Sequence, residues 1–164
     1  MSTFILIFLS WISTWRGGGA TEQAPDLLII GNDTLYLSTF PLEQLQFEIR
    51  PFKYGHFYFP NSGCWRGYQA TWKVVENKLL LTEIARADIT REKIDVFQYF
   101  HTNNYTPTVY NGLIFADWFT SDLTTYKRDF PRYDCNFKGW RKKRYRPALR
   151  FESGVMTMRN LRRL

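Results

Sequence analysis

Residues 68–81 read YQATWKVVENKLLL, and this stretch decides the fold. Apolar side chains at the even positions from 68 to 74 alternate with polar side chains, and a period of two is typical of a strand with one buried face. Glu76 and Asn77 can turn the chain, because asparagine tolerates a positive φ angle. The stretch therefore predicts a β-hairpin whose return strand begins at the three leucines.

A two-residue turn also predicts the register of this hairpin. It places Trp72 opposite Leu81 and Ala70 opposite Glu83, so that Glu83 shares the apolar face of Trp72. A carboxylate on such a face is costly unless it is paired or hydrogen-bonded. Glu83 is therefore a residue whose surroundings need an explanation.

Turn signals and apolar runs predict further strands on both sides of the hairpin. The predicted strands cover residues 27–30, 34–39, 113–119, 123–126, 145–151 and 155–158. The first two form an opening hairpin around Gly31-Asn32-Asp33, and Pro41 ends its second strand. The last two form a closing hairpin around Ser153-Gly154. We expect residues 123–126 to pair with the buried strand 113–119.

One segment changes its period from two to three. Within residues 88–100, Ile94, Phe97 and Phe100 predict a short amphipathic helix with Asp88 or Thr90 as its N-cap. Aromatic residues make up 18% of the chain, and such residues suit a pleated, half-buried surface. We expect a mostly β (α+β) domain, an antiparallel sandwich or barrel-like sheet with one short helix.

The N-terminus predicts an exported protein. The apolar run at residues 4–9 is too short to span a bilayer but fits a signal peptide, with small residues before a cut after Ala20. Residues 1–20 are then a signal peptide and 21–164 a single β-rich domain; the alternative is a buried N-terminal strand. In an oxidising compartment Cys64 and Cys135 are candidates for a disulfide, and otherwise they are two small buried residues.

Candidates for catalysis are few. Glu83 and Asp117 both fall among apolar residues, and two buried acids with raised pKa values suit general acid–base chemistry. The alternative is that each caps a strand or pairs with Arg66 or Arg86. His56 and His101 lack partners at ligand spacing, and no nucleotide-binding or CxxC motif occurs. We therefore expect no metal and no cofactor.

The last quarter of the chain carries the positive charge. Residues 1–126 contain 9 basic and 12 acidic residues, whereas residues 127–164 contain 13 basic and 3 acidic ones. The candidate binding residues are Trp140, Arg141, Lys142, Lys143, Arg144, Arg146 and Arg150. Basic side chains with interleaved rings suit an acidic protein, an anionic glycan or a membrane surface, and less well a nucleic acid. The alternative is a solvated outer face of an edge hairpin.

Residues 64–72, CWRGYQATW, followed by the leucines at 79–81, resemble a group of uncharacterised exported bacterial proteins. Residues 31–35 (GNDTL), 41–43 (PLE) and 116–119 (ADWF) are similar to that group as well. The resemblance implies a leader peptide and a compact β-rich domain, and it implies no activity.

Together these features favour a non-enzymatic exported binding module that makes contact through its basic C-terminal hairpin. One alternative is a hydrolase-like enzyme that uses buried carboxylates at Glu83 and Asp117. Another is a nucleic-acid-binding domain.

Overall fold

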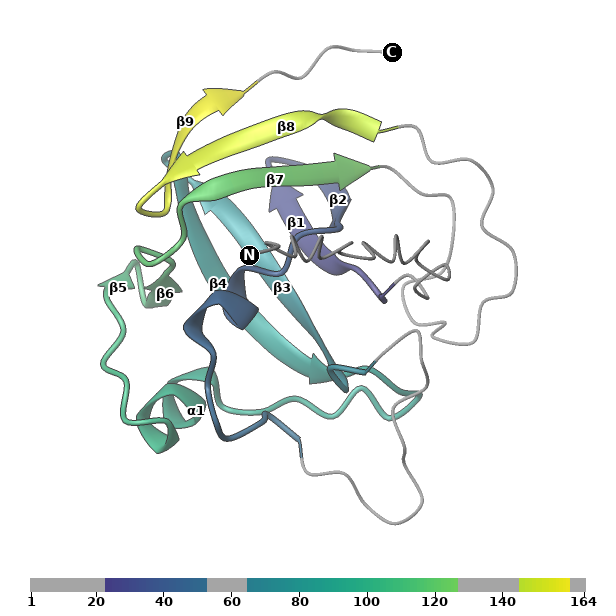
Figure 1. Cartoon of the computed structure of the whole chain (residues 1–164), viewed down its shortest axis with the longest axis vertical. Helices are drawn as coiled ribbons and strands as arrows, with labels where there is room; N and C mark the ends of the chain where they lie inside the picture. The colour runs from purple at the N-terminus through teal and green to yellow at the C-terminus, as the bar shows by residue number, and fades with distance from the viewer. Residues whose placement is uncertain (1–22, 53–64, 127–144, 160–164) are drawn as a thin grey trace, which may run out of the picture.

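The computed structural model describes residues 23–52, 65–126 and 145–159, and for residues 126, 145–148 and 159 it describes the backbone only. Nine strands lie within these residues (Figure 1). They are β1 (Asp26–Ile30), β2 (Asp33–Leu37), β3 (Tyr68–Val75), β4 (Lys78–Arg86), β5 (Val109–Tyr110), β6 (Leu113–Phe115), β7 (Ser121–Tyr126), β8 (Tyr145–Glu152) and β9 (Val155–Arg159). A 3-10 helix, η1 (Pro41–Leu45), and an α-helix, α1 (Val96–Thr102), accompany them.

Seven of these strands close into a barrel. Their order is β3-β1-β2-β7-β8-β9-β4, and β4 pairs back to β3, while β6 and β5 extend outward from β4. The predicted class, mostly β with a barrel-like sheet and one short helix, is confirmed. One pair departs from the antiparallel expectation, since β1 and β3 run parallel.

The central hairpin, β3–β4, forms as predicted, but its register shifts halfway along. Trp72 lies opposite Leu81, as expected, and the turn residues Glu76 and Asn77 both have positive φ angles. The predicted pairing of Ala70 with Glu83 is wrong, because a β-bulge inserts one extra residue and Ala70 lies opposite Ile84. The bulge puts the fully buried Ile84 into the barrel and keeps a carboxylate out of it.

The opening and closing hairpins are confirmed as β1–β2 and β8–β9. The predicted pairing of residues 123–126 with 113–119 is wrong. β7 pairs with β2 and β8, whereas β6 ends at Phe115 and pairs with β4 and β5. The chain turns directly after β6, since the Phe119 amide donates to the Ala116 carbonyl at 2.9 Å. That turn sends β7 to the other side of the barrel.

The barrel closes between β9 and β4 over a short contact. Lys78 pairs with Val155, and the Leu79 amide donates to the Gly154 carbonyl at 2.9 Å. Gly154 has a φ of +74°, and a Cβ at this position would lie 2.4 Å from the Ala116 carbonyl oxygen. Only glycine fits this approach without a shift of the backbone.

Aromatic and leucine side chains fill the barrel. The largest fully buried side chains include Trp72, Tyr68, Phe100, Phe119 and Phe151. Several of these rings contact other rings, as Phe100 does with Trp118 and Phe119 with Phe151. The core is aromatic, as the composition predicts, and barrels of this size have interiors that side chains can fill.

The helix begins later than predicted. α1 starts at Val96 with Asp95 as its N-cap, and the Asp95 carboxylate accepts from the Gln98 amide at 3.0 Å. The predicted caps are wrong: Asp88 accepts from the Thr90 amide in a local turn, and Lys93 still bridges to Ala85 in the sheet. α1 lies at the end of the molecule opposite the β8–β9 hairpin (Figure 1).

Candidate ligand-binding site

Most of the basic residues predicted to bind a partner lie outside the described residues, as do Cys64 and Cys135. Those predictions stay open. Arg146 pairs with Thr125 through its backbone in β8, and its side chain is not described. Arg150 is exposed and donates to both carboxylate oxygens of Asp122, at 2.9 and 3.3 Å. This bond raises the pKa of Arg150 and lowers the pKa of Asp122, so Arg150 already has an acidic partner.

The two carboxylates considered for catalysis are not brought together. Glu83 pairs with Lys93 at 2.5 Å, and Asp117 accepts from the Thr108 hydroxyl at 2.5 Å. Asp117 follows β6, which meets β4 at Leu80 and Leu81. If this register is continued, Asp117 lies level with Lys78 of β4. Glu83 is five residues farther along the same strand, which is a distance of ~15 Å at the usual rise of a strand. The alternative partners Arg66 and Arg86 are also wrong, since Arg66 bonds Asp26 and Arg86 bonds Glu92.

A fully buried salt bridge, which charge patterning did not predict, holds one side of the barrel. Arg66 and Asp26 bond at 2.9 Å, with 1% and 0% of their side chains exposed. Asp26 also accepts from the Ala70 amide and from the Trp72 indole, both at 3.1 Å. Burial would lower the pKa of Arg66, but Asp26 and Tyr68 together more than offset this, and the pKa is raised. The buried Arg66 therefore stays charged, and hydrogen bonds tie the pair to the barrel.

Arg66 also positions Tyr68. The guanidinium carbon lies 3.8 Å from the Phe40 ring centroid and 4.9 Å from that of Tyr68. The Tyr68 hydroxyl in turn donates to a carboxylate oxygen of Glu43 at 2.5 Å. Burial, and then the nearby Asp26, raise the pKa of Tyr68 well above its ordinary value. Tyr68 therefore keeps its proton at neutral pH and donates a hydrogen bond to Glu43.

Three stretches that are far apart in the sequence meet around η1 in this way. Tyr68 reaches Glu43, Arg66 stacks on Phe40, and the Trp118 indole donates to the Pro41 carbonyl at 3.1 Å. Residues 40–43, 66–68 and 118 therefore contact one another in the folded chain. Their contacts fix η1 against the barrel.

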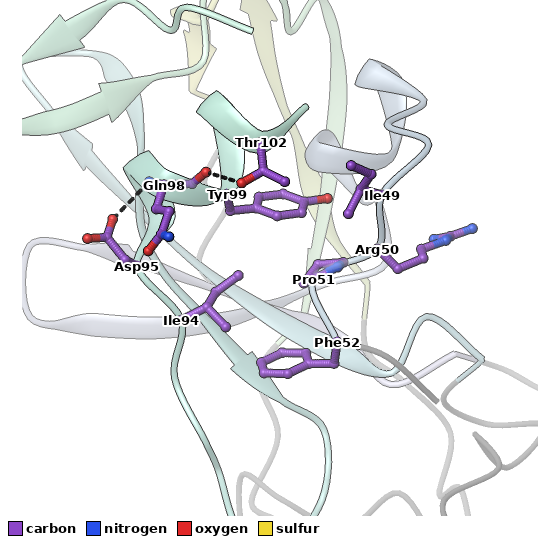
Figure 2. Close-up of a pocket in the computed structure, with 9 residues that line it drawn as sticks. All are labelled: Ile49, Arg50, Pro51, Phe52, Ile94, Asp95, Gln98, Tyr99 and Thr102. Carbon is purple, nitrogen blue, oxygen red and sulfur yellow. Dashed lines mark hydrogen bonds between the residues drawn. The ribbon is translucent and has the colours of Figure 1, made fainter. Parts of the chain in front are cut away.

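An open hollow of about 580 Å³ lies between α1 and the segment that follows η1 (Figure 2). Its apolar walls are Ile49, Pro51, Phe52, Ile94 and Tyr99. Its polar lining comes from Arg50, Asp95, Gln98 and Thr102. Asp95 and Thr102 are both bonded to the α1 backbone. The volume and the mostly apolar walls are typical of small-molecule sites.

Tyr99 links this hollow to a second, smaller recess of about 260 Å³ beside η1. Its ring forms one wall of the hollow, and Figure 2 shows its hydroxyl pointing toward Ile49 and Pro51. No hydrogen bond joins this hydroxyl to another of the described residues. Burial, and then Glu43, raise the pKa of Tyr99. A neutral hydroxyl therefore remains available to a ligand.

Arg50 is the other residue that lines both spaces. Its stem borders the hollow, and its guanidinium points away from the centre of the hollow in Figure 2. The guanidinium lies 3.3 Å from both oxygens of Glu43, which lines the recess. It also lies 5.1 Å from the ring centroid of Trp65. Opposite charges therefore stand side by side at the edge of the recess.

The sequence shows little that could have revealed this site. Tyr68 reads as one more inward residue of an alternating strand, and Glu43 and Arg50 are isolated charges. The one available signal is the irregular spacing of apolar residues at positions 47–52, which fits neither a helix nor a strand. Loops held on a rigid scaffold often carry binding residues.

The chain matches no protein-family model, no curated protein and no solved structure. Within the described ranges, no three His, Cys, Asp or Glu side chains are grouped so that they could hold a metal ion. None of the helices in the described part of the chain is long and apolar enough to span a bilayer. The geometry alone therefore defines the class: a small closed β-barrel with an open apolar hollow beside its helix.

Proposed function

We propose that this protein is a non-enzymatic binding protein, and that it takes a small ligand with an apolar body in the hollow beside α1. The observation that carries the proposal is the hollow itself. Its apolar walls are Ile49, Pro51, Phe52 and Ile94, and the Tyr99 hydroxyl at its margin is bonded to no other residue that the structure describes. A few polar groups at the margin of an apolar cavity are the usual means of orienting a ligand.

The walls of the hollow are tied to the barrel and to each other, which supports a preformed site. Tyr99 and Gln98 belong to α1, whose Phe100 is fully buried in the barrel core. The Ile49 amide donates to the Asn103 side chain at 3.0 Å, and the Asn103 side chain donates back to the Ile49 carbonyl. These two bonds join the two walls at one end. A site held in this way loses little entropy on binding.

The contact through the basic C-terminal hairpin stays a prediction, and so does export. In the described part of the hairpin, Arg150 is held by Asp122. A contact of this kind therefore rests on residues 140–146 and on the excess of positive charge after residue 126. Acidic proteins, anionic glycans and membrane surfaces remain its expected partners.

The hollow is tested with 3-phenylpropan-1-ol, which joins an apolar body to one hydroxyl group. We expect saturable binding by NMR titration, with shifts centred on residues 49–52 and 94–102. Ile49→Asp should weaken binding at least tenfold, since it places a charge on an exposed apolar wall. The matched control is Val109→Asp, an equally exposed apolar residue that does not line the hollow. Equal binding by both variants, or no binding by the wild type, would contradict the proposal.

A further inference from the structure

The recess beside η1 differs in character from the hollow. It is lined by Glu43, Gln46, Arg50, Tyr68 and Tyr99 together with two apolar residues. The recess therefore offers a carboxylate, a guanidinium, an amide and the Tyr99 hydroxyl, whereas the hollow is mostly apolar. Arg50 and Tyr99 line both spaces, so the polar groups of the recess lie next to the part of the hollow that these two residues form.

The charges at the recess keep bonding capacity for a ligand. Glu43 accepts from Tyr68 through one oxygen and from Arg50 through both, so the second oxygen has room for another donor. Arg50 uses only its Nη1 atom toward Glu43, and its Nη2 and Nε groups have no hydrogen-bond partner in the described ranges. The side chains are 27% exposed for Glu43 and 39% exposed for Arg50, so a ligand can reach both.

The carboxylate is also held in place. Tyr68, which donates to Glu43, is stacked by the buried Arg66, and Arg66 is bonded to Asp26. Glu43 itself lies in η1, whose Pro41 carbonyl accepts from Trp118. A charge with a fixed position can select among ligands, because it does not move to follow a poorly matched group.

We infer that the ligand of this site carries a zwitterionic head group, as a free α-amino acid with an apolar side chain does. This inference rests on the proposed function. The ammonium group bonds to the Glu43 carboxylate, the carboxylate group bonds to the Arg50 guanidinium, and the apolar side chain lies in the hollow. The dipole of the head group then runs antiparallel to that of the Glu43–Arg50 pair.

A head group with a single charge fits less well. A lone carboxylate would gain from Arg50 but would lie beside the like charge of Glu43. A lone ammonium would gain from Glu43 and lie beside Arg50. An uncharged head group would displace water from Glu43 and Arg50 without offering either of them a charged partner in its place. The pair is neutral overall, and a neutral head with separated charges complements both members.

Four compounds with the same aromatic body test this inference: phenylalanine, 3-phenylpropanoate, 2-phenylethylamine and 3-phenylpropan-1-ol. By NMR titration or calorimetry, phenylalanine should bind roughly tenfold more tightly than 3-phenylpropanoate or 2-phenylethylamine, as expected for one added charge-assisted hydrogen bond, and more tightly still than the alcohol, which lacks both charges. Arg50→Gln should remove the preference over 2-phenylethylamine, and Glu43→Gln the preference over 3-phenylpropanoate. Lys73→Gln, an exposed charge on β3, should leave both preferences unchanged.

The outcomes separate the two proposals. If the alcohol binds in the hollow and phenylalanine binds no more tightly, the inference about the head group is wrong and the proposed function stands. If neither Arg50→Gln nor Glu43→Gln changes the preferences, the inference is also wrong. If none of the four compounds binds, both proposals fail. Circular dichroism spectra of each variant verify that the barrel remains folded.

Discussion

Two salt bridges built from the same residue types lie in opposite surroundings in this barrel. Asp26 and Arg66 are 0% and 1% exposed, on the β1–β3 side, whereas Asp122 and Arg150 are 45% and 52% exposed, on the β7–β8 side. The first pair is bonded to three further groups of the protein. The second is held by two hydrogen bonds across neighbouring strands.

The difference shows that burial, and not residue type, decides what a charged pair contributes. A buried pair is tolerated only when every polar atom has a partner, and removal of one member leaves a charge without compensation. An exposed pair gains little, because water and salt screen it. Arg66 of the buried pair also stacks on Tyr68, which lines the recess. The Asp122–Arg150 pair orders only its own two outward side chains.

The largest effect is expected for Arg66→Met. The substitution leaves the Asp26 carboxylate buried without its counter-charge, and the free energy of unfolding should fall by about 3–5 kcal/mol. Urea denaturation followed by tryptophan fluorescence measures the loss. Arg150→Met is the matched control and should leave the urea midpoint nearly unchanged. Equal losses in the two variants would show that burial does not distinguish the pairs.

Gly154→Ala should have the next largest effect. It tests the comparison from the other side, because Gly154 makes a tight contact on the side of the barrel that holds the exposed pair. A Cβ would lie 2.4 Å from the Ala116 carbonyl oxygen, in a residue with a φ of +74°. We expect a loss of roughly 2–4 kcal/mol from overpacking and backbone strain together. Gly31→Ala, with a φ of +59° and open space around it, should lose only about 1–2 kcal/mol. Similar losses would mean that the closure between β4 and β9 can relax.

High pH should weaken the region around Tyr68. Burial, and then Asp26, raise its pKa in the folded state, so its contribution is fully present below the ordinary tyrosine pKa of ~10 and is lost as the pH rises above it. Between pH 10 and 12 the wild type should lose up to ~1.4 kcal/mol per pH unit more than Tyr68→Phe. Tyr110, whose pKa is raised mainly by its hydrogen bond to Glu76, is the comparison, and Tyr110→Phe should change the profile less than Tyr68→Phe does. Parallel pH profiles for the wild type and Tyr68→Phe would show that Tyr68 ionises freely.

The smallest effect is expected at low pH, on the exposed pair. The hydrogen bond from Arg150 lowers the pKa of Asp122 in the folded state. Its contribution is therefore present above the ordinary aspartate pKa of ~3.9 and is lost as the pH falls below that value. Asp122→Asn should flatten the acid limb of the stability profile slightly and leave the urea midpoint at pH 7 nearly unchanged. A large loss at pH 7 would overturn the contrast between the two pairs.

Local signals predicted the hairpins well and their assembly poorly. The alternation at residues 68–74 and the Glu76-Asn77 turn depend only on neighbours in sequence, and both are confirmed. The bulge was not predictable, because it depends on whether Ile84 or Glu83 fits the barrel interior. The start of α1 was misplaced for a related reason. Lys93 forms a β-bridge with Ala85, so the helix cannot begin before it. The three-residue spacing at positions 94–100 does not reveal this bridge, and the predicted helix therefore began too early.

The sequence by itself determined the β-rich class, the three hairpins and an aromatic core, because periodicity and turn chemistry act over a few residues. Only the tertiary structure decided the parallel β1–β3 pair, the closure at Gly154, the burial of Asp26 with Arg66 and the hollow beside α1. These features join residues that are about 40 or more positions apart. Which distant surfaces meet depends on how side chains fill one barrel, and no local pattern records that.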